Sequence, residues 1–309
     1  MTVLLVGEVN VDYLVTNDSA VVAHWNAAGA VRRRGGMVWN SASTLDRLGV
    51  DVFVYAPHGE EFLVASAEKI RGTLSPRLGT SFRDNICLSL LRPGGERMTV
   101  FVPFERQEQY FRALRETVPA VAEQVESVVE AVFISSTEET FTVLQLEDAA
   151  LLMPIYISLS NVVKYWSTNA LKFALLNADV VFLNETELGL LEARIGPVGA
   201  GTFSGRLRLL VVTCAERGVL CLSPAGTMRH EVPLGVVGRA EQVGAGDTFA
   251  GAFVYAELRA GSGISQAVAL AQVAAYEWLV ERRRPDVERL LFLVRGVVVP
   301  TASWQAWPA

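Results

Sequence analysis

Short runs of consecutive apolar residues recur along the chain, each about the length of a buried β-strand, and helix-length segments separate them. Strands that alternate with helices are typical of a mostly parallel sheet with helices on both faces. We therefore predict an α/β fold. The predicted strands are Val3–Val6, Val52–Tyr55, Ala131–Ile134, Ile155–Ile157, Val180–Leu183 and Leu209–Val212. Examples of the predicted helices are Trp39–Leu48, Tyr110–Val118, Asn169–Leu176 and Ile264–Glu281.

Two segments in the N-terminal third interrupt this alternation. Asp12–Arg34 mixes polar and apolar residues directly after the first predicted strand. Asn85–Phe104 has the pattern of a β-hairpin, with its turn at Pro93–Gly95. Paired together, the two segments would form a small sheet beside the main body, which makes them a candidate lid. The alternative is a surface β-excursion with no role in function.

The composition excludes several classes of protein. A chain of 309 residues, 51% of them hydrophobic and 19% charged, suffices for one large α/β domain or two smaller ones. The formal net charge of −6 argues against binding nucleic acid through its phosphates. No stretch approaches the roughly 20 apolar residues of a membrane span, and the N-terminus does not resemble a signal peptide. We expect a soluble cytoplasmic protein with neither nucleic acid nor membrane as a partner.

The cysteines and histidines do not suggest a metal site. Cys87, Cys214 and Cys221 are odd in number, and no pair has metal-ligand spacing. Cys87 and Cys221 lie in apolar runs, so we expect buried thiols in a reducing cytoplasm. The three histidines are scattered along the chain.

The run Glu241–Phe253 carries the clearest chemical signal. Its small residues Gly244, Ala245 and Gly246 lead into a helical pattern. The start of a helix presents unpaired backbone N–H groups and the positive end of the helix dipole, and glycines allow a phosphate to approach them. Such an anion hole suits phosphoryl transfer, and Asp247 in the first helical turn would accept the proton of an attacking hydroxyl. The alternative is that Asp247 only caps the helix.

The segment Gly244–Gly251 resembles the C-terminal signature of the ribokinase-like (PfkB-type) carbohydrate kinases. Other blocks with a family resemblance precede it in the expected order, and together the matches run from about residue 3 to about residue 280. The resemblance implies one ribokinase-like domain over residues 1–309, with three layers, a central mostly parallel sheet and a small β-sheet lid at about 12–34 and 85–104. The preceding blocks are Val6–Asp12, Gly35–Ala42, Leu45–Gly49, Asn184–Glu187 and Thr213–Gly218.

The resemblance also implies roles for single residues in an ATP-dependent kinase of a sugar or nucleoside. Asp247 would be the base, and the amides of Gly244, Ala245 and Gly246 the anion hole. The substrate would be bound by Asp12, Gly35, Gly36 and Asn40; the nucleotide by Asn184, Thr213, Gly218 and Gly246; and Mg²⁺ by Glu187 through a water molecule. For each binding residue the alternative is a turn or helix-cap role. The lid would exclude water, and it is a candidate contact for a homodimer.

Several positions depart from the family pattern. Glu241 and Gln242 replace the usual Asp and Thr before the signature, which puts a monovalent-cation site in doubt. Ala215 replaces a glycine of the nucleotide-binding turn. The block after the middle strand is degraded to Leu159–Val163, with Lys164 as a candidate substitute, and Gly59–Glu61 replaces Gly-Asp-Asp. We therefore keep a second hypothesis, a catalytically weak relative that binds a small ligand for regulation or assembly.

The substrate is left open by the sequence. Trp39 is large where simple sugar kinases often have small residues, and it either stacks on a ligand ring or, as we prefer, points into the core. Arg32–Arg34 is either a site for a phosphorylated sugar or, the preferred interpretation, a solvated run. A Rossmann oxidoreductase is a poor fit because Gly7–Asn10 lacks the glycine fingerprint, and a P-loop kinase is a poor fit because its motif does not occur.

Overall fold

The computed structural model describes most of the chain. The described residues are 1–17, 27–65, 70–77, 84–91, 97–102, 112, 129–135, 153–231, 243–281, 284, 286–295 and 303–307. The predicted helix Tyr110–Val118, the turn Pro93–Gly95 and the departures Glu241 and Gln242 lie outside them, Arg112 excepted.

The main sheet contains nine of the described strands, in the order β13-β12-β11-β10-β9-β8-β1-β4-β5. From β11 to β5 all neighbours are parallel, whereas β12 and β13 run antiparallel at the other edge. The six predicted strands are confirmed, and each belongs to this sheet. The strands are β1 (Thr2–Gly7), β4 (Asp51–His58), β5 (Thr73–Arg77), β8 (Val129–Ser135), β9 (Ile155–Ser158), β10 (Val180–Asn184), β11 (Leu209–Thr213), β12 (Val219–Ser223) and β13 (Gly226–His230).

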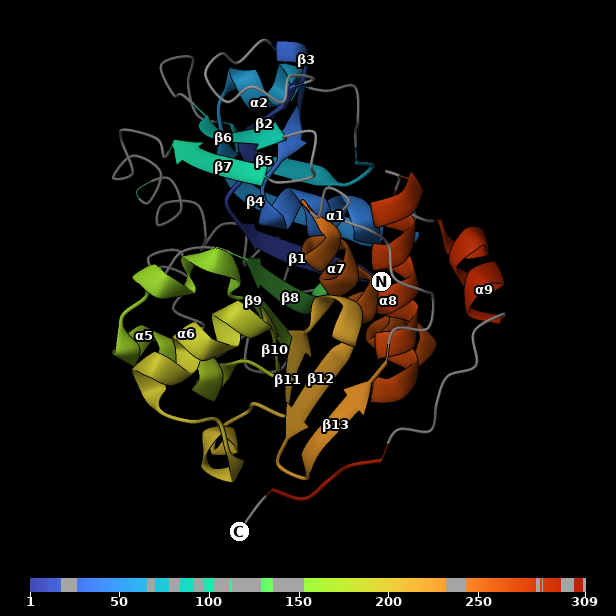
Figure 1. The fold of residues 1–309 in the computed structure, drawn as a ribbon. Helices are drawn as coiled ribbons and strands as arrows, with labels where there is room; N and C mark the ends of the chain where they lie inside the picture. The colour runs from blue at the N-terminus through green and yellow to red at the C-terminus, as the bar shows by residue number, and fades with distance from the viewer. Residues whose placement is uncertain are drawn as a thin grey trace.

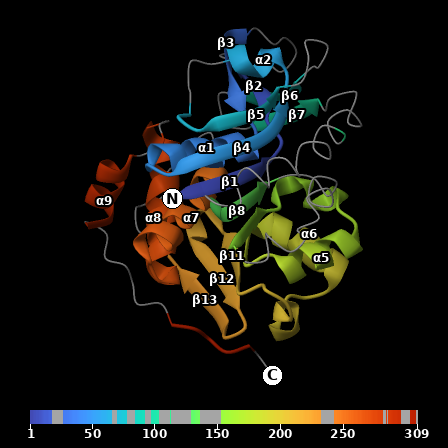
Figure 2. The same ribbon diagram turned by 180° about the vertical axis from the view of Figure 1, so that it is seen from behind.

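Helices cover both faces of this sheet (Figures 1 and 2). On one face lie α1 (Met37–Arg47), α7 (Ala245–Ala260) and α8 (Ile264–Glu281), and on the other lie α5 (Thr168–Asn177) and α6 (Glu185–Ile195). The three described helices that we predicted, α1, α5 and α8, are confirmed within two residues at each end. The remaining described helices are α2 (Glu60–Val64), α9 (Val287–Arg295) and the short 3₁₀ helices η2 (Ser160–Tyr165), η3 (Ala200–Phe203) and η4 (Ala215–Arg217).

Alternation along the central strands produces two separate cores. In β10, Val180 and Phe182 pack in the core beneath α1, α7 and α8, while Val181 and Leu183 pack in the core beneath α5 and α6. The other parallel strands divide in the same way because successive side chains of a strand point to opposite faces. The three-layer arrangement is therefore confirmed.

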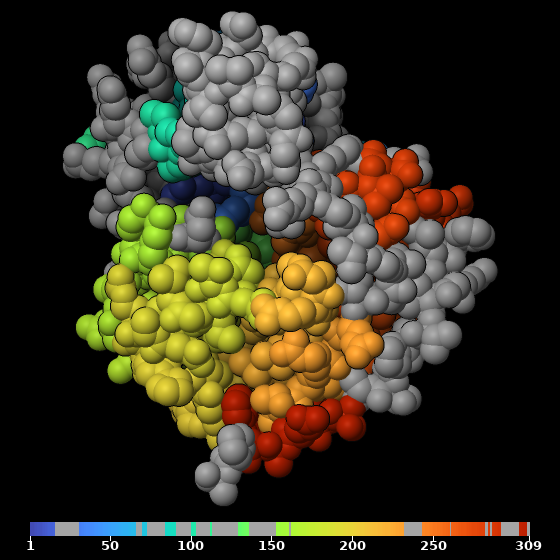
Figure 3. All heavy atoms as spheres, viewed as in Figure 1, coloured from blue at the N-terminus to red at the C-terminus, as the bar shows by residue number. Residues whose placement is uncertain are grey.

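A second sheet stands beside the main body, in the order β3-β2-β6-β7 (Figure 1). Its strands are β2 (Asn10–Asn17), β3 (Ala27–Gly35), β6 (Asn85–Leu91) and β7 (Arg97–Val102). The two interrupting segments therefore pair as predicted, through β2 and β6. The space-filling view is hollowed between this small sheet and the main body (Figure 3).

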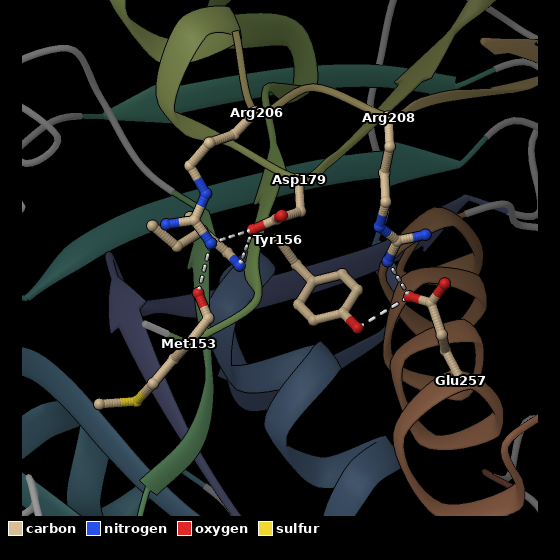
Figure 4. Close-up of polar contacts among 7 residues, drawn as sticks. Met153, Tyr156, Asp179, Arg206, Arg208 and Glu257 are labelled. Carbon is tan, nitrogen blue, oxygen red and sulfur yellow. Dashed lines mark hydrogen bonds and ion pairs between the residues drawn. The ribbon is translucent and has the colours of Figure 1, made fainter. Parts of the chain in front are cut away.

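A network of charged side chains joins the sheet to α7 at the amino ends of the parallel strands (Figure 4). Glu257 accepts hydrogen bonds from the Tyr156 hydroxyl at 2.8 Å and from Arg208 at 2.7 Å. Beside them, Asp179 accepts from Arg206 at 2.7 Å. These bonds fix the part of α7 that lies ten residues beyond Asp247.

Two smaller predictions can also be compared with the structure. Cys221 is buried as expected, whereas Cys87, which we also expected to be buried, is only half-buried. Cys214 is buried as well. Trp39 points into the core, where its ring and the Phe62 ring form a T-shaped pair with centroids 5.2 Å apart. Among the described helices, none combines the length and apolar character that a bilayer crossing requires.

Candidate active site

Helix α7 begins in the way the small-residue run predicts. Gly244 caps it in the left-handed conformation, with φ 80° and ψ 0°, and the amide of Thr248 closes the first turn on the Gly244 carbonyl at 2.9 Å. The amides ahead of Thr248 have no acceptor within the helix. A side chain at Gly246 would meet open space, so an anion has room to approach this helix end.

Asp247 lies in that first turn, half-buried and held by helix α1. Asn40 donates its Nδ2–H to Oδ2 of Asp247 at 2.9 Å, and the Ser41 hydroxyl donates to the Asp247 carbonyl at 3.1 Å. Burial raises the pKa of Asp247 to about 7. Asn40 and the Arg284 guanidinium oppose this rise in pKa, whereas the carboxylates of Glu187 and Asp12 add to it. A carboxyl group poised near neutral pH suits a general base.

The second predicted acid, Asp12, is buried on β2 and faces the same region. It accepts a hydrogen bond from Asn10, and Arg33 on the neighbouring strand lies 3.5 Å away, Nε to Oδ2. Gly35 lies directly against the Asp12 carboxylate, because a Cβ there would overlap it. Gly36 has φ 98° and caps α1, and a Cβ there would lie 2.7 Å from the Glu8 carbonyl. Both glycines are thus required by the close approach of the backbone to the Asp12 region.

The solvated run preferred for Arg32–Arg34 is right for Arg32, which is exposed, and wrong for Arg34. Residues directly opposite in a sheet share a face, so Arg33 lies on the face of its partner Asp12, while Arg32 and Arg34 lie on the other. Arg34 is buried: it donates to the carbonyls of Phe62, at 3.0 Å, and Leu63. Its guanidinium also stacks 5.2 Å from the centroid of Trp39. Arg32 also donates to the Glu61 carbonyl at 2.9 Å, so Arg32 and Arg34 attach the small sheet to α2 and the residues that follow β4.

Asn184 and Glu187 form a capping box at the start of α6. The Asn184 side chain accepts from the Glu187 amide at 2.9 Å, and Glu187 Oε2 accepts from the Asn184 amide at 2.9 Å. The pair therefore has the geometry of a helix start, which is the alternative role that we gave for it. Glu187 is buried, which raises its pKa.

The fit to Mg²⁺ at Glu187 is limited to contact through water. One of its carboxylate oxygens serves the capping box, and the described residues contain no cluster of three acidic, histidine or cysteine side chains around a common point. Mg²⁺ readily keeps several water ligands and takes phosphate oxygens, so a single carboxylate that reaches it through water is compatible with this donor set.

The turn Thr213–Gly218 follows β11 at the same edge of the sheet as Asn184, which pairs with Thr213. Gly218 has φ 86°, and a Cβ there would overlap the carbonyl of His230 on β13. The turn closes on itself, because the Cys214 amide donates to the Gly218 carbonyl at 2.8 Å. The local fold alone thus accounts for the glycine at 218.

Sequence reasoning missed Arg284 and Trp278. Arg284 is buried, donates from Nη2 to Oδ1 of Asn40 at 2.7 Å, and stacks 4.6 Å from the Trp278 centroid. Trp278 in turn donates to the Val243 carbonyl at 2.7 Å, just before the helix cap. Neither residue belongs to a recognisable motif, so only the tertiary structure brings them to Asp247.

The comparison with protein-family models decides the identity of the chain. The model described as pfkB family carbohydrate kinase matches residues 2–282. The chain belongs to this family. No curated protein sequence matches it.

Solved structures give the same result for the fold of this pfkB-family protein. A Burkholderia thailandensis nucleoside kinase in complex with inosine is 16% identical, with a TM-score of 0.74 over 96% of this chain and 100% of that one. A Methanocaldococcus jannaschii nucleoside kinase of the ribokinase family is 14% identical, with a TM-score of 0.76 over 96% and 98%. An Arabidopsis thaliana ribokinase with ribose and ATP is 16% identical, with a TM-score of 0.73 over 95% and 98%. At these identities the likeness establishes the fold.

Two departures from the pfkB-family pattern have visible structural consequences. Ala215 has φ 48°, so it keeps the left-handed backbone of the glycine that the pattern expects. Lys164, the candidate substitute in the degraded block, is exposed and stacks 4.8 Å from the centroid of Tyr165. The first departure preserves the turn, and the second leaves the lysine on the surface of η2.

Proposed function

We propose that this protein is an ATP-dependent kinase that transfers the γ-phosphate to a hydroxyl group of a sugar or nucleoside. The observation that carries this proposal is the position of Asp247, half-buried beside helix-start amides that have no acceptor within the helix, with its pKa raised to about 7. A positioned base of this kind typically contributes about 10²- to 10⁴-fold in rate.

The start of α7 supplies the electrostatic part of the mechanism. The amides of Gly244, Ala245 and Gly246 stabilise the charge on the transferred phosphoryl group, and the carboxylate of Asp247 accepts the proton of the attacking hydroxyl. Gly246 contributes room for the phosphate, as the open space at the position of a Cβ there supports.

The acceptor lies between the small sheet and α1. Asp12 accepts hydrogen bonds from its hydroxyl groups, and Gly35 and Gly36 let the backbone come close. Asn40 borders the same space, but its amide already bonds Arg284 and Asp247, so its main task is to hold the base. The small sheet acts as the lid of one kinase unit and excludes water during transfer.

The nucleotide lies across the carboxyl ends of β10 and β11, where open α/β sheets bind ligands. Asn184, Thr213 and Gly218 border it, and Glu187 reaches Mg²⁺ through water. When bound, Mg²⁺ neutralises phosphate charge. The chain itself contributes the rigid helix start and the turn that position these residues.

The lid sheet is also our candidate for a homodimer contact. Its edge strands β3 and β7 expose apolar side chains, with exposed fractions of 56% for Val31, 49% for Phe101 and 50% for Val102. Exposed apolar residues at sheet edges favour pairing with another chain. Light scattering of the wild type and of F101E tests this contact: a dimer that becomes a monomer on substitution supports it, and a monomeric wild type contradicts it.

One observation favours the second hypothesis, a weak relative that binds a small ligand. The capping box and the turn at Gly218 account for Asn184, Glu187 and Gly218 without a nucleotide. A panel of sugars and nucleosides, each assayed for ATP-dependent phosphorylation, separates the two hypotheses. Turnover of an acceptor well above a D247A control supports the kinase. Binding of ATP or acceptor without turnover above that control supports the weak relative.

A further inference from the structure

Arg284 is a buried cation next to the candidate base. Only 4% of it is exposed, and its Nη2 donates to Oδ1 of Asn40 at 2.7 Å. Burying a charge is costly unless the charged group is paired and hydrogen-bonded. The buried guanidinium of Arg284 therefore depends on its hydrogen-bond partners, of which Asn40 is one.

The bond from Arg284 determines the orientation of the Asn40 amide. A guanidinium only donates hydrogen bonds, so the end of the amide that faces Arg284 is the oxygen. The NH₂ end then faces Asp247 and donates to its Oδ2 at 2.9 Å. With the amide turned round, its oxygen would meet the carboxylate, and its NH₂ would meet the guanidinium. Arg284 thus excludes an orientation in which Asn40 repels Asp247.

Arg284 is itself fixed by contacts with two other segments. Its guanidinium stacks 4.6 Å from the centroid of Trp278 in α8, and Arg47 at the end of α1 donates to its backbone carbonyl at 2.9 Å. The Trp278 ring also donates from its Nε1 to the Val243 carbonyl at 2.7 Å, and Val243 directly precedes the Gly244 cap. Arg284, Asn40 and the start of α7 therefore form one connected unit.

We propose that Arg284 is a positioning residue for phosphoryl transfer, which holds the Asn40 amide so that it aligns the Asp247 carboxylate and which supplies a fixed positive charge beside that carboxylate. The proposal rests on the kinase function proposed above. Among the described residues that shift the pKa of Asp247, the charges of Glu187 and Asp12 raise it and the charge of Arg284 lowers it. Arg284 thus offsets two carboxylates that would otherwise favour the protonated, inactive base.

Three substitutions separate the two tasks. R284M removes both the charge and the hydrogen bond, R284K keeps the charge, and R284Q keeps a neutral donor. For R284M we expect kcat to fall about 10- to 100-fold, with the KM for ATP changed less than about threefold, because the base loses its alignment. Its acidic limb of kcat/KM should move up by about one pH unit. R284K should keep the acidic limb of the wild type but have a lower kcat. R284Q should show the shifted acidic limb, and its kcat should fall less than that of R284M.

R289M is the matched control. Arg289 pairs with buried Glu277 at 3.1 Å in the adjoining part of the chain, outside the site. R289M should lower the thermal stability without moving the acidic limb. The proposal is overturned if R284M has the wild-type kcat per folded molecule and the wild-type limb, or if R289M shifts the limb as much as R284M does. If R284M does not fold, kcat and the acidic limb of kcat/KM are measured for R284K and R284Q, and the same outcomes decide the proposal.

A second readout needs no turnover. The difference in melting temperature between a protein and its D247N form, followed against pH, levels off above the pKa of Asp247. In the R284Q or R284M background this plateau should begin about one pH unit higher than in the wild type. An unchanged plateau contradicts our assignment to Arg284. A shifted plateau in a protein that phosphorylates no acceptor supports the assignment and contradicts only the proposed kinase function.

Discussion

The amide of Asn40 donates to the Asp247 carboxylate across 2.9 Å, although 207 positions separate the two residues in the chain. This bond joins α1 to the start of α7. Close packing of the two helices makes it possible, because a Cβ at Gly251 would lie 2.9 Å from the Ser41 carbonyl. The geometry of the helix start thus depends on a residue one turn beyond Asp247.

The pH dependence of turnover follows from the pKa of Asp247. A base accepts a proton only when it is ionised, and this carboxyl has a pKa of about 7. We predict that kcat/KM for the acceptor falls about tenfold per pH unit as the pH drops below about 7. The measurement is a pH–rate profile at saturating ATP. A flat profile between pH 5.5 and 8 would show that no group with this pKa must be ionised.

The same carboxyl affects the stability of the fold. Its pKa is raised from 3.8 in the unfolded chain to about 7 in the fold, so the folded protein binds the proton more tightly. The resulting stabilisation is present at low pH and is lost as the pH rises through about 7. D247N, which is neutral throughout, should therefore be more stable than the wild type at pH 8, by about 2 kcal/mol after allowance for solvent screening.

Thermal melts of both proteins at pH 8 and pH 5.5 check this prediction. The advantage of D247N should shrink at the lower pH. A D247N variant that is less stable than the wild type at pH 8 would mean that the ionised carboxylate stabilises the fold.

Gly35 tests the position of Asp12. A Cβ at Gly35 overlaps the Asp12 carboxylate, so G35A should displace it and raise the KM for the acceptor about tenfold or more, since hydrogen bonds to a charged group contribute about 1.5–3 kcal/mol. The KM for ATP should change little. G189A is the control, because a Cβ on this helical glycine meets no atom within 4 Å. Equal effects of G35A on both substrates would indicate general damage instead.

Glu257 tests the anchoring of α7. Ten helical residues place it about 15 Å from Asp247 along the axis. E257A leaves the Tyr156 hydroxyl and Arg208 without their shared acceptor, and we predict a loss of about 1–3 kcal/mol in the free energy of unfolding. Urea denaturation measures it, with E288Q on the exposed face of α9 as a control. The kcat of the folded variant should stay within about threefold of the wild type, and a collapse of kcat would contradict the separation of the two regions.

The sequence predicted the framework well because strand and helix patterns are local. The continuous apolar run Val180–Leu183 reflects the two cores that such a strand contacts, and the small residues before Asp247 predict a helix start. Trp39 could be assigned only as a preference, since its size fits both a core and a ligand pocket.

What could not be predicted depends on tertiary contacts. Arg32–Arg34 reads as a solvated run, yet strand alternation sends Arg33 to Asp12 and buries Arg34 against Trp39. Arg284 lies in a further arginine run with no motif, and its role near Asn40 appears only when α1 and the segment after α8 meet.

The most direct test of the central claim is the kcat of D247N with the best acceptor from the substrate panel, together with the dissociation constants of ATP and that acceptor. We predict a kcat about 10²- to 10⁴-fold below the wild type, with both dissociation constants within a few-fold of it, because the substitution removes the base and keeps the acceptor oxygen for the Asn40 bond. A D247N variant that keeps more than a tenth of the wild-type kcat would contradict the assignment of Asp247 as the base.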